Sequence, residues 1–217
     1  YATLSHLYAN LPSKSMVDVI LAASQALEKD AYLSNADAVL NRLAHATYDL
    51  GQFPDADKWC REGQRRFPAD YRFVECELLL MTSKYVPADP ATAPARAWVL
   101  ADSVVALTPD PRDQRYERLY TRVLVAGVLA RTGLMDSARS VLRSAKVDPE
   151  VDPSHDLAFT AAFIWTLAGD TTEALNQLKL FLVANPGAVP EFRDNPNWWF
   201  RGISEDPRYK EIVGSAP

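Results

Sequence analysis

Apolar and small residues recur at helical spacing along most of this 217-residue chain. Between Asp37 and Pro68 the helical period of about 3.6 residues is interrupted once, at Gly51. Glycine adopts the left-handed conformation that ends a helix at little cost, and proline stops the helix that follows. The pattern therefore predicts two helices that pair across a short turn at Gly51.

The same spacing of a turn glycine and an alanine occurs three times. The alanine follows its glycine by five residues at Gly51 and Ala56, at Gly133 and Ala138, and at Gly169 and Ala174. The last two glycines are 36 residues apart, and the first lies 82 residues before the second, which leaves room for two longer units. Such a period is typical of a solenoid whose helix pairs contact only their neighbours.

Less regular segments fill the rest of the first two thirds of the chain. Helical periodicity predicts a helix over 71–85 and another over 94–107, with the proline-rich linker 86–93 between them as an extended loop. Residues 4–11 and 16–31 predict a further helix pair, which can cap the array at its beginning.

The residues at the turn and at the end of the first pair carry a family resemblance. Gly51, Ala56, Gly63 and Pro68 stand where the tetratricopeptide repeat (TPR) has its turn glycine, the alanine of its second helix, its second small residue and its terminal proline. This resemblance implies an all-α fold, a right-handed superhelical solenoid of antiparallel helix pairs. It divides the chain into an N-terminal helical cap over 1–36, four TPR-like pairs over 37–70, 71–110, 115–150 and 155–188, and a capping segment over 189–217.

The capping segment is rich in aromatic residues. Trp198, Trp199 and Phe200 precede the run that begins at Asp206 and ends at Tyr209, and this ending resembles those of C-terminal TPR arrays in bacterial multidomain proteins. We interpret the segment as a lid in which the aromatic side chains cover the apolar end of the last pair.

Composition and motifs restrict the function further. The net charge is −5 and the basic residues are scattered, which argues against nucleic-acid binding. The longest apolar stretch, 157–168, is too short to span a membrane. No phosphate-binding, zinc-protease or nucleophile-elbow motif is present, so we expect neither a cofactor nor an enzyme. We expect a cytoplasmic protein, or an extracytoplasmic one if a leader or membrane anchor has been removed.

The two cysteines, Cys60 and Cys76, fall on adjacent predicted helices. They could form a disulfide, but two buried free thiols are the commoner outcome at such positions, and that is our expectation. His45 could join them at a metal site, although the spacing of dedicated zinc sites is missing. We expect ordinary packing for all three residues.

The resemblance also implies where a partner binds, because the first helix of each TPR pair lines the concave groove. The positions that point into the groove are Asn41, His45, Tyr48, Arg72, Glu75, Tyr120, Phe159 and Phe163. Arg72 could hold a carboxylate of the partner. Phe159 and Phe163 have an alternative role, because they could pack against the lid instead.

We therefore expect a protein–protein interaction module or scaffold that binds a peptide or protein partner in its concave groove. Two alternatives remain open. The chain could be a regulatory or sensor fragment of a larger bacterial signalling enzyme, such as a kinase or cyclase. It could also be a structural subunit of a larger assembly.

Overall fold

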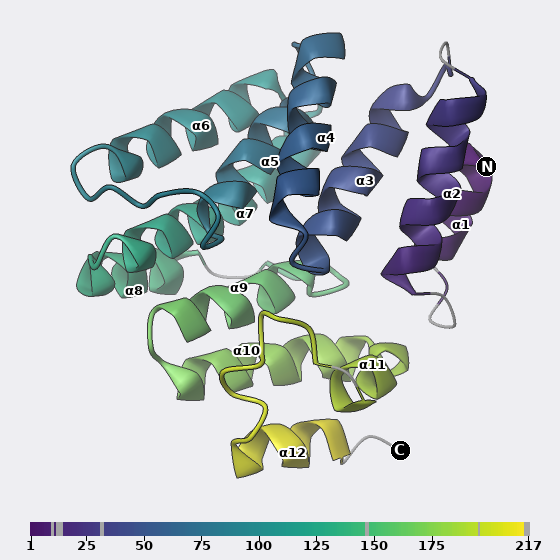
Figure 1. Cartoon of the computed structure of the whole chain (residues 1–217). Coiled ribbons are helices and arrows are strands. Elements are labelled where there is room, and N and C mark those ends of the chain that lie inside the picture. The colour runs from purple at the N-terminus through teal and green to yellow at the C-terminus, as the bar shows by residue number, and fades with distance from the viewer. Residues whose placement is uncertain (10, 12–14, 31–32, 146–147, 195, 215–217) are drawn as a thin grey trace. The chain divides into compact units, whose positions relative to one another are not determined.

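The computed structural model describes residues 1–9, 11, 15–30, 33–145, 148–194 and 196–214. All regular elements of these residues are helices, and no strand occurs among them (Figure 1). The all-α class predicted from the sequence is therefore confirmed. The chain divides into two compact units, residues 1–86 and 87–217.

Among the residues that the structure describes, the first unit contains five helices. They are α1 (Ala2–Ala9), α2 (Met16–Lys29), α3 (Ala36–Asp49), α4 (Phe53–Arg66) and α5 (Tyr71–Met81). α1 packs on α2 and α2 on α3, α3 pairs with α4, and α5 packs against both members of that pair (Figure 1). α1 and α2 lie close to their predicted positions, although residue 31, the predicted end of the second helix, lies outside the described residues.

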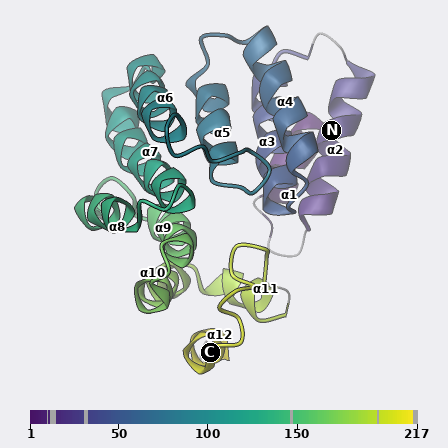
Figure 2. The same ribbon diagram turned by 60° about the vertical axis from the view of Figure 1, so that its left-hand side comes forward.

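The second unit contains the remaining helices. They are α6 (Ala93–Leu107), α7 (Pro111–Arg131), α8 (Met135–Ser144), α9 (Asp156–Leu167), α10 (Thr171–Ala184), α11 (Val189–Asp194) and α12 (Pro207–Gly214), with a 3₁₀ turn over Pro186–Ala188. α7 packs against α6, α8 and α9, and α9 pairs with α10 (Figure 2). α12 begins at Pro207, as predicted from the sequence.

The turn glycines behave as the sequence predicts. Gly51, Gly133 and Gly169 have φ angles of 72°, 83° and 69°, which lie in the left-handed region that favours glycine. The alanines that follow them by five residues, at positions 56, 138 and 174, are fully buried. At all three sites, one in the first unit and two in the second, the glycine therefore forms the turn between two helices. The alanine five residues later is buried where the helices pack.

One predicted pair is divided by the boundary between the units. The sequence pairs the helices of residues 71–110, but α5 belongs to the first unit and α6 to the second. α5 packs against α3 and α4, whereas α6 packs against α7. The boundary falls at the start of the proline-rich linker 86–93, where proline removes backbone donors and restricts the chain to extended conformations. In the part of the chain that the structure describes, no helix is both long enough and apolar enough to cross a membrane.

Candidate functional site

Polar contacts join α3 to α5 and to its C-cap Thr82, in the two segments that the sequence predicts to line a groove. Arg72 donates to Asp37 across 2.5 Å, and the hydroxyl groups of Tyr48 and Thr82 are 2.6 Å apart. These partners are 35 and 34 residues apart in sequence, close to one repeat length. Residues about 35 positions apart, in α3 and in α5 with its C-cap Thr82, therefore contact each other within the first unit.

Arg72 is already held by carboxylates of its own chain. Its Nε and Nη2 donate to the two carboxylate oxygens of Asp70 over 2.9 and 2.6 Å, and Nη2 also reaches Asp37. The hydrogen bonds that Arg72 donates to Asp70 and Asp37 raise the pKa of Arg72 despite its partial burial. Its guanidinium group therefore fixes the start of α5 against α3, and a partner's carboxylate would compete with two internal ones.

His45 and Glu75 form the next contact along the same face. Nε2 of His45 lies 3.7 Å from Oε1 of Glu75, which is buried. A third of the His45 side chain is exposed, but burial lowers its pKa to about 4, so the imidazole is neutral at neutral pH. Asn41, one turn earlier on α3, is half-buried, and its Oδ1 is buried without a hydrogen-bond partner.

Tyr48 contributes to the core rather than to an accessible surface. Its side chain is 1% exposed, and its ring packs edge-on against Phe53 with 5.6 Å between the ring centres. Tyr120 differs, because it is half-buried and stacks on Tyr116 of the same helix at 5.9 Å. Of the predicted aromatic positions, only Tyr120 and Phe159 are not fully buried.

Phe159 and Phe163 pack against the C-terminal lid, as the alternative interpretation of the sequence proposed. The ring of Trp199 stacks on Phe159 at 4.8 Å and on Phe163 at 4.5 Å. Phe163 is 1% exposed, so a partner would have to displace the lid to reach it. The lid is further fixed by the buried Tyr209, whose hydroxyl donates to the carbonyl of Phe192 over 3.0 Å. Burial raises the pKa of Tyr209 to about 12.

The expectation of two free thiols is wrong. Cys60 on α4 and Cys76 on α5 form a disulfide, and both residues are 2% exposed. Their Cα atoms are 5.9 Å apart, within the range that a disulfide requires, because α4 and α5 cross closely. The bond also removes both thiolates that a metal site with His45 would need.

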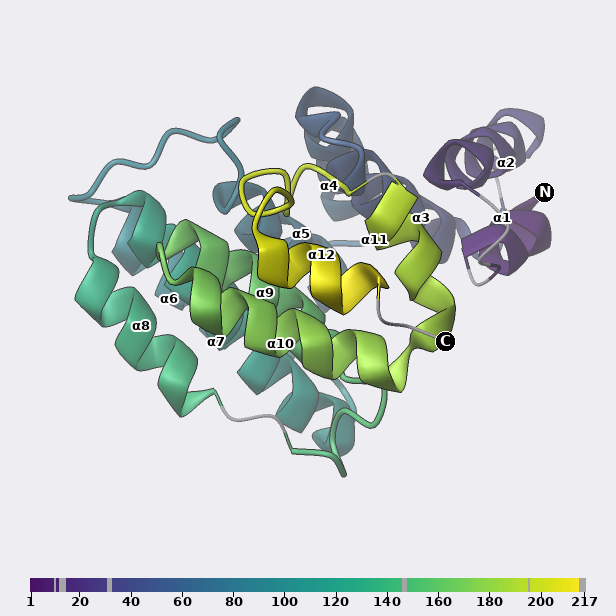
Figure 3. The same cartoon turned by 90° about the horizontal axis from the view of Figure 1, so that it is seen from below.

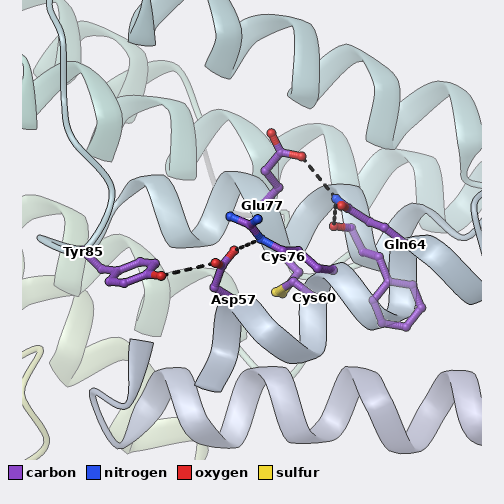
Figure 4. Close-up of polar contacts among 8 residues, drawn as sticks. Asp57, Cys60, Gln64, Cys76, Glu77 and Tyr85 are labelled. Atoms are coloured by element: carbon purple, nitrogen blue, oxygen red, sulfur yellow. Dashed lines mark hydrogen bonds and ion pairs between the residues drawn. A yellow bond between two sulfur atoms is a disulfide. The ribbon is translucent and has the colours of Figure 1, made fainter. Parts of the chain in front are cut away.

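Hydrogen bonds flank this disulfide on both sides (Figure 4). Toward the start of α4, Asp57 accepts from Arg61 over 3.0 Å and from the hydroxyl of Tyr85 over 3.3 Å. Toward its end, Gln64 donates to the carbonyl of Phe73 over 3.1 Å and to Glu77 over 3.2 Å. α4 and α5 are therefore held together by covalent, polar and apolar contacts.

A cleft that the sequence does not predict lies between α10 and α12, and these two helices run side by side (Figure 3). Its volume is about 600 Å³, and its lining is mostly apolar. Leu175, Leu182 and Val183 of α10 contribute to one wall and Ile212 of α12 to the other. A signal was present in the sequence, because residues 171–184 carry apolar residues on more than one face of the helix. In the structure, Leu180 and Val183 of this helix remain exposed.

Comparisons of the chain with family models, with curated proteins and with solved structures found no match.

Proposed function

We propose that this protein is an interaction module, a TPR-like scaffold of helix pairs that binds a peptide or protein partner along the inner faces of its first helices. The observation that carries the proposal is the set of contacts between α3 and α5, in which residues about one repeat apart face each other. In a solenoid this arrangement repeats from pair to pair and produces one continuous inner surface. We propose that the pairs form a right-handed superhelix of this kind.

The surface available to a partner is smaller than the sequence suggested. Tyr48 and Phe163 are buried, and Arg72 binds internal carboxylates. Asn41, His45 and Tyr120 keep part of their side chains accessible. We therefore assign partner recognition within the first unit to Asn41 and His45, propose Tyr120 as a separate contact on the second unit, and treat Arg72 and Glu75 as residues that position α5.

The test is to capture partners from the native source with the wild-type chain and with variants of the inner face. Asn41→Ala is suited to this because no hydrogen bond to its Oδ1 is lost. Gln52→Ala is the matched control, since Gln52 is an exposed amide at the start of α4. We expect Asn41→Ala and Tyr120→Ala to lose the specific partner and Gln52→Ala to retain it. Retention by all three variants would refute recognition through the inner face.

The Cys60–Cys76 disulfide bears on where this function takes place. Disulfides persist in oxidising compartments and are rare in the cytoplasm, where thiols are kept reduced. The disulfide therefore favours the extracytoplasmic alternative over the cytoplasmic expectation. Alkylation of the chain in its native source, before and after reduction, tests this. Labelling of both cysteines without reduction would support a cytoplasmic location.

A further inference from the structure

A second cavity lies in the first unit, where α3 packs between α2 and α4 (Figure 1). Its volume is about 500 Å³, and its apolar lining comes from Leu27 of α2, Leu40 of α3 and Trp59 of α4. Leu40 is fully buried, whereas Leu27 and Trp59 are half-buried and pack against the core of the first unit. The cavity therefore offers a well-packed apolar base for a side chain of a ligand.

One face of α4 surrounds this base with positive charge. Lys58, Arg61 and Arg65 line the cavity at i, i+3 and i+7 of the helix, and Arg66 lines it one position later. Among the described residues of the lining, Glu62 supplies the one carboxylate. From Lys58 to Arg66 the cations extend over about 12 Å at 1.5 Å per residue. Four cations and one carboxylate therefore line this cavity, although the chain as a whole carries a net charge of −5.

The two arginines nearest the middle of this face keep donors for a ligand. Arg61 donates through Nε to Asp57 over 3.0 Å, and Arg65 donates through Nε and Nη2 to Glu62 over 3.0 and 2.6 Å. Their side chains are 76% and 70% exposed. Because a guanidinium group has five N–H donors, neither ion pair uses all of them, and a carboxylate of a ligand can add to each pair.

Lys58 is the cation on which recognition depends most. Its side chain is exposed, and it forms no ion pair among the residues that the structure describes. Its ammonium nitrogen lies 4.4 Å from the centre of the Trp59 ring, so a charge and an apolar surface adjoin at one point of the cavity. Arg66 is engaged within the chain, with its guanidinium carbon 5.4 Å from the centre of the Phe67 ring, and contributes its charge alone.

We propose that this cavity binds a short acidic segment of a partner protein. Carboxylates of the segment pair with the exposed cations of α4, and one apolar side chain, a leucine or a phenylalanine, covers Leu27 and Trp59. An extended anionic surface, such as a membrane or a nucleic acid, would repel a chain that is acidic as a whole, so the local positive charge favours a short segment. The cavity shares no residue with the inner face assigned above, so each proposal can fail without the other.

The probes are three labelled peptides of about 12 residues, and their binding to the full chain is measured by fluorescence anisotropy. The first has glutamates around a central phenylalanine, the second has alanine in place of the phenylalanine, and the third has glutamines in place of the glutamates. We expect the first peptide to bind most tightly and the other two to bind about tenfold more weakly, because each lacks one of the two interactions. Added salt should weaken binding of the first peptide.

Two exposed lysines provide a matched pair of variants. Lys58→Glu should weaken binding of the first peptide by about threefold to tenfold, because it removes one exposed charge pair and adds one repulsion. Lys84→Glu makes the same change of charge at an exposed residue that does not line the cavity, and it should leave binding unchanged. Circular dichroism confirms that both variants are folded. Absence of binding by all three peptides, equal loss in both variants, or equally tight binding of the glutamine peptide would overturn the proposal.

Two further measurements distinguish this cavity from another site and another occupant. Asn41→Ala should retain the first peptide; if it loses the peptide while Lys58→Glu retains it, the peptide lies on the inner face and the proposal is wrong. Vesicles of phosphatidylglycerol should not bind. If they bind in a Lys58-dependent manner while no peptide does, the cavity docks on an anionic membrane, and the proposal is again wrong.

Discussion

Gly63 is the position at which one added methyl group should disturb this fold most. It lies on α4 where the helix crosses α5, and a Cβ atom there would be 2.0 Å from Cε1 and 2.1 Å from Cδ1 of Phe73. Real Cβ atoms do not approach other atoms this closely, so either the ring or the helix must move. Gly63→Ala therefore forces a rearrangement of the α4–α5 contact.

Neither response is easy, for reasons that the structure provides. The ring of Phe73 is fully buried and stacks on Phe67 with 6.3 Å between ring centres, so it has no space to move into. α4 cannot separate freely from α5, because the Cys60–Cys76 disulfide joins the helices one turn before Gly63. Both routes therefore cost packing energy.

The magnitude follows from two opposing effects. Overpacking a buried contact costs about 1–3 kcal/mol, and here the overlap is severe. Replacing glycine by alanine inside a helix contributes about 1 kcal/mol of stability in the opposite direction. Because the overlap is severe, we take the overpacking cost from the upper part of its range and subtract the gain in helix propensity. The free energy of unfolding should therefore fall by about 1–2 kcal/mol.

Urea unfolding followed by circular dichroism measures this loss. Gly214→Ala is the control, because an added Cβ at Gly214 meets no atom within 4 Å, and it should leave stability unchanged or slightly raised. A second variant, Gly63→Ala with Phe73→Leu, should recover part of the loss, since the smaller side chain leaves room for the methyl group. A Gly63→Ala chain as stable as the wild type would refute the close crossing.

Three other perturbations have defined outcomes. Gly133→Ala should cost about 1–2 kcal/mol through backbone strain alone, because its φ is 83° and no atom lies within 4 Å of an added Cβ; an unchanged urea midpoint would contradict the turn geometry. Reducing the disulfide between Cys60 and Cys76, which are 16 residues apart, should cost about 3 kcal/mol in the same assay. The folded-state pKa of His45, about 4, lies below its unfolded value near 6.5, so His45 makes stability fall as the pH drops from about 6.5 to 4, and His45→Gln should reduce that slope.

The local features of the fold could be predicted because they depend on neighbouring residues. A glycine that must adopt a positive φ and a proline that must start a helix act within one turn of chain, and Gly51, Gly133, Gly169 and Pro207 all have their predicted roles. The burial of Ala56, Ala138 and Ala174 was also predictable, because each follows its turn by a fixed number of residues.

Features that depend on contacts between distant residues could not be predicted. Whether Cys60 and Cys76 bond depends on a Cα separation that the helix pattern does not define. Tyr48 and Phe163 occupy positions that would face a groove, yet Thr82 and Trp199 cover them. The pattern of one helix indicates which face is apolar, but it does not indicate which other segment covers that face.

The same reasoning explains why the cleft between α10 and α12 was missed. The sequence predicts that residues 189–217 form a lid over the last pair, and the rings of Trp199 and Phe200 do pack against Phe159 of α9. α12 lies beside α10 without filling the space between them, and Val183 remains exposed. How completely a lid covers a helix depends on its path through space, which the spacing of apolar residues does not specify.

Recognition through α3 and α5 is tested by hydrogen exchange of the chain with and without the captured partner. We predict that the partner slows exchange of amides in α3 and α5, over residues 36–49 and 71–81, and leaves α4 less affected. Protection confined to α4, or to other helices with α3 and α5 unchanged, would contradict recognition through the inner face.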